Sequence, residues 1–134
     1  MWDTLTSPLV SKASTLMTYA KGDKIFEQGK IYSFIAVVLE GSCRLERKLP
    51  LGETIYFLTH SPPLEVHGDT CFLLNEAASC SLVASEGEVR ALLITGNFLR
   101  ADFIRLYPSL VAAFYFHLCR CLSDRSHRQL EQLQ

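Results

Sequence analysis

The sequence lacks any apolar run approaching the roughly 20 residues that span a bilayer, and it lacks an excess of either charge. Its 134 residues include 13 lysine or arginine residues and 14 aspartate or glutamate residues, which gives a net charge of −1. Such a balance supplies no overall field that would draw the chain to nucleic acid or to an anionic membrane. We therefore expect a cytoplasmic domain with no transmembrane segment and no direct contact with nucleic acid.

Motifs for covalent catalysis and for redox chemistry are also missing. The five cysteines form no Cys-x-x-Cys pair, and no Gly-x-Ser-x-Gly elbow surrounds a nucleophilic serine. Cys119 and Cys121 are two residues apart, so on a helix their thiols point to different sides. We interpret Ser79, Ser81 and Ser85 as polar residues on the wet face of a strand. The sequence therefore does not predict an enzyme.

What is present is the composition of one folded domain. Hydrophobic residues make up 49% of the chain and charged residues 20%, which is typical of globular proteins and not of disordered segments. A chain of this length is large enough for a single hydrophobic core. We expect one domain over residues 1–134.

Short strands separated by glycine dominate the middle of the sequence, over about 22–95. The alternation of Cys43 and Leu45 with Arg44 and Glu46 indicates a strand with one buried and one exposed face. The seven glycines fall between the apolar runs, where turns need a positive φ. The predicted strands are Lys24–Phe26, Phe34–Leu39, Ser42–Glu46, Thr54–Leu58, Glu65–His67, Ser81–Ala84 and Val89–Ile94. This pattern predicts a jelly-roll β-barrel.

Helical periodicity flanks the predicted barrel. Ser7-Pro8 is a typical start for a helix over about 8–18. After the barrel, Asn97 is a candidate cap for a helix over about 98–106, and Tyr107-Pro108 ends that helix. A second helix is then predicted over about 109–133.

The last predicted helix is apolar on more than one side, so we expect two surfaces to cover it. One is its own barrel, and the other is a neighbouring domain of a larger protein or a second copy of the chain. The candidate interaction residues are Phe114, Tyr115, Phe116, Leu118 and Leu122. For Phe114 and Leu118, packing on the barrel is the favoured explanation.

The sequence motifs of the barrel resemble those of the cyclic-nucleotide-binding domain family, in its catabolite-activator-like form. The resemblance rests on Tyr19-x-x-Gly22-Asp23-x-Ile25-Phe26-x-Gln28-Gly29, on Val37-Val38-Leu39-Glu40-Gly41 and on Gly68-Asp69. It implies a mainly β fold with a jelly-roll barrel, one N-terminal helix and two C-terminal helices. It also implies a non-enzymatic regulatory domain of a signalling protein or transcription regulator.

The segment after Gly68-Asp69 departs from the family pattern. In the family, a phosphate-binding cassette of Phe-Gly-Glu, a short helix and an arginine holds the cyclic phosphate. Here the Phe-Gly-Glu place falls near residues 71–73 and the arginine place near Ala78. No arginine occurs between Arg47 and Arg90. The resemblance implies cyclic AMP or cyclic GMP as the ligand, but the cassette residues do not support it, and we expect no cofactor.

Three readings of the cassette region follow. In the first, the cassette is lost or remodelled and the domain acts as an interaction or regulatory module. A related prediction is that Leu73 and Leu74 point inward and fill the nucleotide site. In the second, a remodelled pocket holds a less charged ligand; its candidate residues are Phe72, Leu73, Leu74, Asn75, Glu76, Ser79 and Ser81. The third and least supported reading is a cupin-like metalloenzyme that uses His60 and His67. These histidines are seven residues apart, so we expect solvated loop residues and no metal site.

Overall fold

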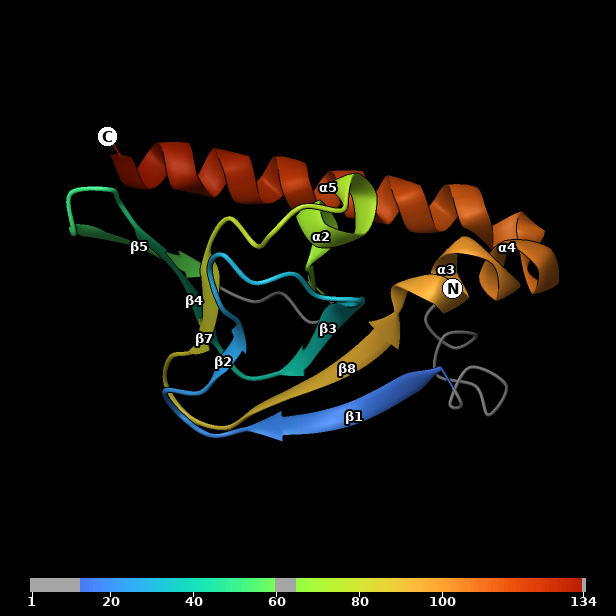
Figure 1. The fold of residues 1–134 in the computed structure, drawn as a ribbon, viewed down its shortest axis with the longest axis horizontal. Helices are drawn as coiled ribbons and strands as arrows, with labels where there is room; N and C mark the ends of the chain where they lie inside the picture. The colour runs from blue at the N-terminus through green and yellow to red at the C-terminus, as the bar shows by residue number, and fades with distance from the viewer. Residues whose placement is uncertain (1–12, 60–64, 134) are drawn as a thin grey trace.

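The chain forms two four-stranded antiparallel sheets that pack into a β-roll (Figure 1). The computed structural model describes residues 13–59 and 65–133. The first sheet has the order β1-β8-β3-β6, with bounds Ser14–Tyr19, Val89–Thr95, Phe34–Glu40 and Glu65–His67. The second has the order β2-β7-β4-β5, with bounds Lys24–Phe26, Ser81–Ala84, Cys43–Lys48 and Thr54–Thr59. The predicted mainly β fold is confirmed.

Four helices accompany the sheets in the described part of the chain. They are α2 (Asp69–Leu74), α3 (Gly96–Arg100), α4 (Asp102–Leu106) and α5 (Pro108–Leu133). Helix α5 runs along one side of the molecule with α2 beside it (Figure 1), and Phe72 of α2 contacts Phe114 and Tyr115 of α5. None of these helices is long and apolar enough to cross a membrane.

Strand β3 explains how the helices are fixed to the roll. Ile35 and Val37 lie in a cluster with side chains of α2, α3, α4 and α5, whereas Ala36 and Val38 lie in the cluster inside the roll. Successive side chains of a strand point to opposite faces, so a strand buried on both faces reads as a continuous apolar run. The helices therefore share a core with the sheet that also forms the wall of the roll.

Gly68 shapes the turn from β6 into α2. Its φ is 88°, and a Cβ at this position would lie 2.7 Å from the Phe26 ring. Only glycine accommodates both the left-handed backbone and this close approach. The turn places Asp69 at the start of α2 with its side chain buried, directly after β6.

The prediction of a helix over about 8–18 is wrong for the residues that the structure describes. Ser14–Tyr19 is strand β1, which pairs with β8 from Ser14 opposite Ile94 to Tyr19 opposite Val89. The helical spacing of apolar residues here predicted that Leu16 would be buried, but Leu16 is 50% exposed. Pairing with β8 satisfies the backbone of this segment and outweighs the local pattern. Residues 8–12 lie outside the described part of the chain.

The single helix predicted over about 98–106 is two helices, α3 and α4. Ala101 separates them with φ −125° and ψ −78°, outside the helical region. Thr95, and not Asn97, is the N-cap of α3, because its hydroxyl accepts a hydrogen bond from Phe98 N at 3.3 Å. The last helix agrees with its prediction to within one residue at its start.

Candidate functional site

A cavity of about 230 Å³ lies between the β-roll, the start of α2, the segment 78–80 and helix α5. Its apolar lining includes Phe26, Leu45, Leu82 and Leu122. Its charged residues and its histidine come from four elements: Arg47 of β4, His67 of β6, Asp69 of α2 and Arg125 of α5. Residues from distant parts of the sequence therefore meet around one hollow with both apolar and polar walls.

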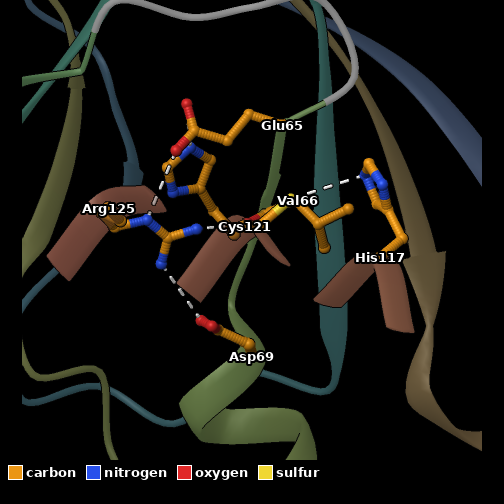
Figure 2. A network of polar contacts seen from close by, with 7 residues as sticks. Glu65, Val66, Asp69, His117, Cys121 and Arg125 are labelled. Carbon is orange, nitrogen blue, oxygen red and sulfur yellow. Dashed lines mark hydrogen bonds and ion pairs between the residues drawn. The ribbon is translucent and has the colours of Figure 1, made fainter. Parts of the chain in front are cut away.

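Arg125 connects helix α5 to the elements beneath it. Its Nη2 donates a hydrogen bond of 2.6 Å to the carbonyl oxygen of Val66, and its Nε donates one of 3.4 Å to Glu65 Oε1. Its Nη1 lies 3.5 Å from Asp69 Oδ1. Figure 2 shows the guanidinium between the two carboxyl groups. One side chain of α5 therefore binds β6 and the start of α2 together.

The carboxyl group of Asp69 is only partly satisfied by Arg125. Its side chain is 6% exposed, and its Oδ2 has no hydrogen-bond partner among the described residues. Two carboxyl groups, those of Glu65 and Asp69, share this one guanidinium. Burying a polar atom without a partner is costly. The Asp69 Oδ2 is therefore a costly buried acceptor beside the cavity.

His67 is the second unexpected member of the site. Its side chain is 3% exposed, and its Nε2 lies 3.7 Å from Glu65 Oε2. Burial and the charge of Arg125 lower the pKa of His67, and the acidic groups of Glu65 and Asp69 oppose this only in part. The imidazole is therefore neutral near neutral pH. The expectation of a solvated loop histidine is wrong, because His67 ends a strand that is buried under α5.

The lowered pKa of His67 predicts a loss of stability in mild acid. Below about pH 6.5 the unfolded chain takes up a proton on this histidine that the folded chain resists. The free energy of unfolding should therefore fall as the pH falls, by up to about 1.4 kcal/mol per pH unit. Urea denaturation between about pH 7.5 and 5.5 measures the slope, and His67→Gln should reduce it. Equal slopes in the two proteins would refute the prediction.

Leu73 and Leu74 do not fill the site. They are 44% and 63% exposed, and neither lines the cavity. Helix α2 begins directly after Gly68, and it buries Asp69, Cys71 and Phe72 instead. The prediction that the leucines occlude the nucleotide site is wrong, because the side of α2 that packs inward carries Asp69, Cys71 and Phe72, and both leucines stay exposed.

The other predicted pocket residues lie in different places. Ser79 lines the cavity, whereas Phe72 and Asn75 line a separate hollow that also contains Arg100. Arg100 Nη2 donates to the carbonyl oxygen of Phe72 at 2.7 Å. Glu76 is exposed. Ser81 is buried, and its hydroxyl accepts a hydrogen bond of 2.9 Å from Gln28 N, so the expected wet face is wrong at this serine.

The five candidate interaction residues of α5 fall into three groups. Phe114 and Leu118 are buried in the core under the helix, as favoured from the sequence. Tyr115 and Leu122 are half-buried. Phe116 is 66% exposed and points away from this core. On the same helix Cys119 is exposed and Cys121 buried, as their spacing predicted.

The spacing of residues along α5 carries a sequence signal for Arg125. Leu118, Cys121 and Leu122 form the apolar stripe of α5, and Arg125 follows four residues after Cys121 and three after Leu122. A basic residue in register with a buried stripe predicts a buried cation with acidic partners. Glu65 and Asp69 are such partners, but which carboxyl groups meet the arginine depends on the packing of β6 and α2 against α5.

A family match is consistent with this architecture. Residues 16–103 match the family described as the cyclic nucleotide-binding domain. The match covers more than half of the chain, and the chain therefore belongs to this family. No curated protein sequence matches the chain.

Solved structures share the fold. The chain is similar to the c-di-GMP responsive global regulator CLP of Xanthomonas campestris, with a TM-score of 0.76, 14% identity, and coverage of 91% of this chain and 58% of that one. It is also similar to a cyclic nucleotide-binding domain of Methylobacillus flagellatus (TM-score 0.76, 12% identity, 92% and 68% coverage). The catabolite activator protein of Thermus thermophilus is similar at a TM-score of 0.66 and 25% identity, with 96% and 59% coverage. The chain spans less than two thirds of the length of the first and third of these.

Proposed function

We propose that the chain is a non-enzymatic regulatory domain that does not bind cyclic AMP or cyclic GMP in the usual way of its family. The observation that carries this proposal is the lack of a cation in the cassette segment, because the segment 71–80 provides no arginine or lysine to offset the charge of a cyclic phosphate. Residues 78–80 of this segment line the cavity. A phosphate charge without a compensating cation in a desolvated site opposes binding.

The two arginines of the cavity do not replace a cassette arginine in this proposal. Arg125 is engaged by Glu65, Val66 and Asp69, and giving it to a phosphate would leave two buried carboxyl groups without it. Arg47 is exposed on β4, where solvent screens its charge. Arg47 and Arg125 both lie outside the segment 71–80, which holds the phosphate-binding arginine in the family.

Calorimetric titration with cyclic AMP and with cyclic GMP, into the millimolar range, tests this proposal. We expect no specific heat of binding. Saturable binding of either nucleotide would overturn the proposal. In that case Arg47→Ala would show whether the phosphate uses the exposed arginine, because the variant would then bind more weakly.

The regulatory role would act through α5. Phe116 is exposed on the outer side of this helix, and Arg125 ties the helix to the cavity. A change in the cavity that altered the contacts of Arg125 would therefore reach the helix directly. We expect the outer side of α5 to contact another domain of a larger protein or a second copy of the chain.

The cavity itself supports a second candidate function, a small-molecule sensor with a remodelled pocket. It is not filled by Leu73 and Leu74, and it retains a buried acceptor without a hydrogen-bond partner among the described residues. The described residues include no group of three or more His, Cys, Asp or Glu side chains placed to hold a metal ion. His60 lies outside the described residues. The cupin-like alternative therefore gains no support from this part of the structure.

A further inference from the structure

We propose that a hollow beside helix α3 binds a small organic carboxylate: an aromatic or branched apolar group that bears one carboxylate, whose oxygens contact the guanidinium of Arg100. The hollow is lined by the segment 31–34, the end of α2 and the helix α3, and its volume is about 330 Å³. Among the described residues, it shares none of its lining with the cavity that contains Arg125. Binding in this hollow is therefore independent of the proposed function above and goes beyond it.

The guanidinium of Arg100 is held in place by its neighbours. Its Nη2 donates a hydrogen bond of 2.7 Å to the carbonyl oxygen of Phe72, and its central carbon lies 4.9 Å from the centroid of the Phe72 ring. A Cβ at Gly96 would lie 2.9 Å from Arg100 Nη1, so the glycine leaves room for the guanidinium. A planar guanidinium that is already oriented loses little conformational freedom when a ligand binds.

None of these contacts neutralises the charge of Arg100. Arg100 forms no ion pair with another described residue, and it is the sole charged residue among the described residues that line the hollow. The nearby carboxylate of Asp102 pairs instead with Arg105, at 3.1 Å. A guanidinium has five N–H donors, and Phe72 uses one of them here. The side chain is exposed, so its other donors can form a bidentate contact with a planar carboxylate.

The remaining lining suits an apolar body next to the carboxylate. Ile31 is 69% exposed, and the half-buried rings of Tyr32 and Phe34 pack against each other with their centroids 5.4 Å apart. The exposed side chains of Asn75 and Asn97 add amide groups that donate and accept hydrogen bonds. A cavity of about 150 Å³ is known to hold a benzene molecule. A hollow of about 330 Å³ therefore has room for one ring and a short acidic substituent.

Benzoate and benzamide are suitable probes, because they have the same ring and nearly the same shape but differ in charge. We would titrate each into the isotopically labelled protein and follow the backbone amide signals by NMR. Benzoate should shift the signals of Asn75, Asn97 and Arg100 in a saturable way, and benzamide should bind much more weakly. Absence of saturable shifts with benzoate, equal binding of benzamide, or shifts around Ser79 and Arg125 instead would overturn the proposal.

Arg100→Gln tests the assigned contact, and Arg105→Gln is its matched control. Arg100→Gln removes the guanidinium from the hollow and should weaken benzoate binding by about tenfold or more. Arg105→Gln removes an equal charge from an exposed position of α4 outside the hollow, and it should leave benzoate binding unchanged. Arg100→Lys keeps the charge but loses the planar fork, so its binding should fall between the two. Equal losses in Arg100→Gln and Arg105→Gln would contradict the assigned contact.

Gly96→Ala tests the position of the guanidinium without changing any charge. The added methyl group would displace Arg100 Nη1, so this variant should weaken benzoate binding while it remains folded, as judged by its amide spectrum. Unchanged benzoate binding in folded Gly96→Ala would contradict the held geometry. If Gly96→Ala fails to fold, Arg100→Gln still decides the proposal, because Arg100 is exposed and its replacement leaves the core intact.

A carboxylate of this kind occurs both in free acids and at the end of a peptide chain. N-acetylphenylalanine presents the carboxylate as a chain end does, so tighter binding than that of benzoate would favour a peptide terminus and weaker binding a free acid. Its amide should bind much more weakly than the acid; equal binding would overturn the carboxylate contact. The nucleotide titrations fail or succeed independently of these results, since they concern the other cavity.

Discussion

Replacement of Arg125 by methionine should lower the free energy of unfolding by about 3–5 kcal/mol. The change leaves Glu65 and Asp69 buried without their guanidinium, and it removes a hydrogen bond of 2.6 Å to the Val66 carbonyl oxygen. Removing one partner of a buried ion pair costs far more than the pair itself contributes, because an uncompensated charge stays in the interior. Urea denaturation at neutral pH measures the difference.

Arg120→Met is the matched control for this experiment. Arg120 lies on the same helix but is exposed, so its loss should change the free energy of unfolding by less than about 0.5 kcal/mol. Arg125→Lys should fall between the two, because an ammonium group cannot reproduce three contacts of a planar guanidinium. A loss below about 1 kcal/mol for Arg125→Met would mean that the arginine does not hold α5 to β6 and α2.

Replacement of Phe114 by alanine should also lower the free energy of unfolding by about 3–5 kcal/mol. Phe114 is fully buried, and its ring lies 5.4 Å from that of Phe103 and 6.3 Å from that of Phe72, measured between centroids. The truncation would leave a void where α2, α4 and α5 meet, and packed interiors close such voids only in part. Thermal and urea denaturation measure the loss.

Phe116→Ala separates the packing role of α5 from its proposed contact role. Phe116 is 66% exposed, so its removal should change stability by less than about 0.5 kcal/mol. If the outer side of α5 binds a second copy, the same variant should weaken self-association in sedimentation experiments. A Phe116→Ala protein as unstable as Phe114→Ala would show that the exposed ring packs within the domain.

Local sequence signals were sufficient for most of the roll. Glycine turns and alternation of apolar with polar residues predicted β2, β6 and β7 with their observed ends, because strand period and turn geometry are properties of a few neighbouring residues. The same reasoning failed at Ser14–Tyr19. That segment is a strand because it pairs with the edge of β8. This pairing depends on a distant segment, so the residues of 14–19 alone do not predict it.

The sequence by itself determined the fold class, the family and the difference between the segment after Gly68-Asp69 and the phosphate-binding cassette of the family. Each of these depends on which residues occur and in what order. Only the tertiary structure decided what stands in place of the cassette. Glu65, Asp69 and Arg125 are up to 60 residues apart along the chain, yet they form one buried cluster with His67. Their partnership depends on α5 crossing β6 and α2. Contacts between elements distant in sequence are set by packing of the whole core, which no local pattern encodes.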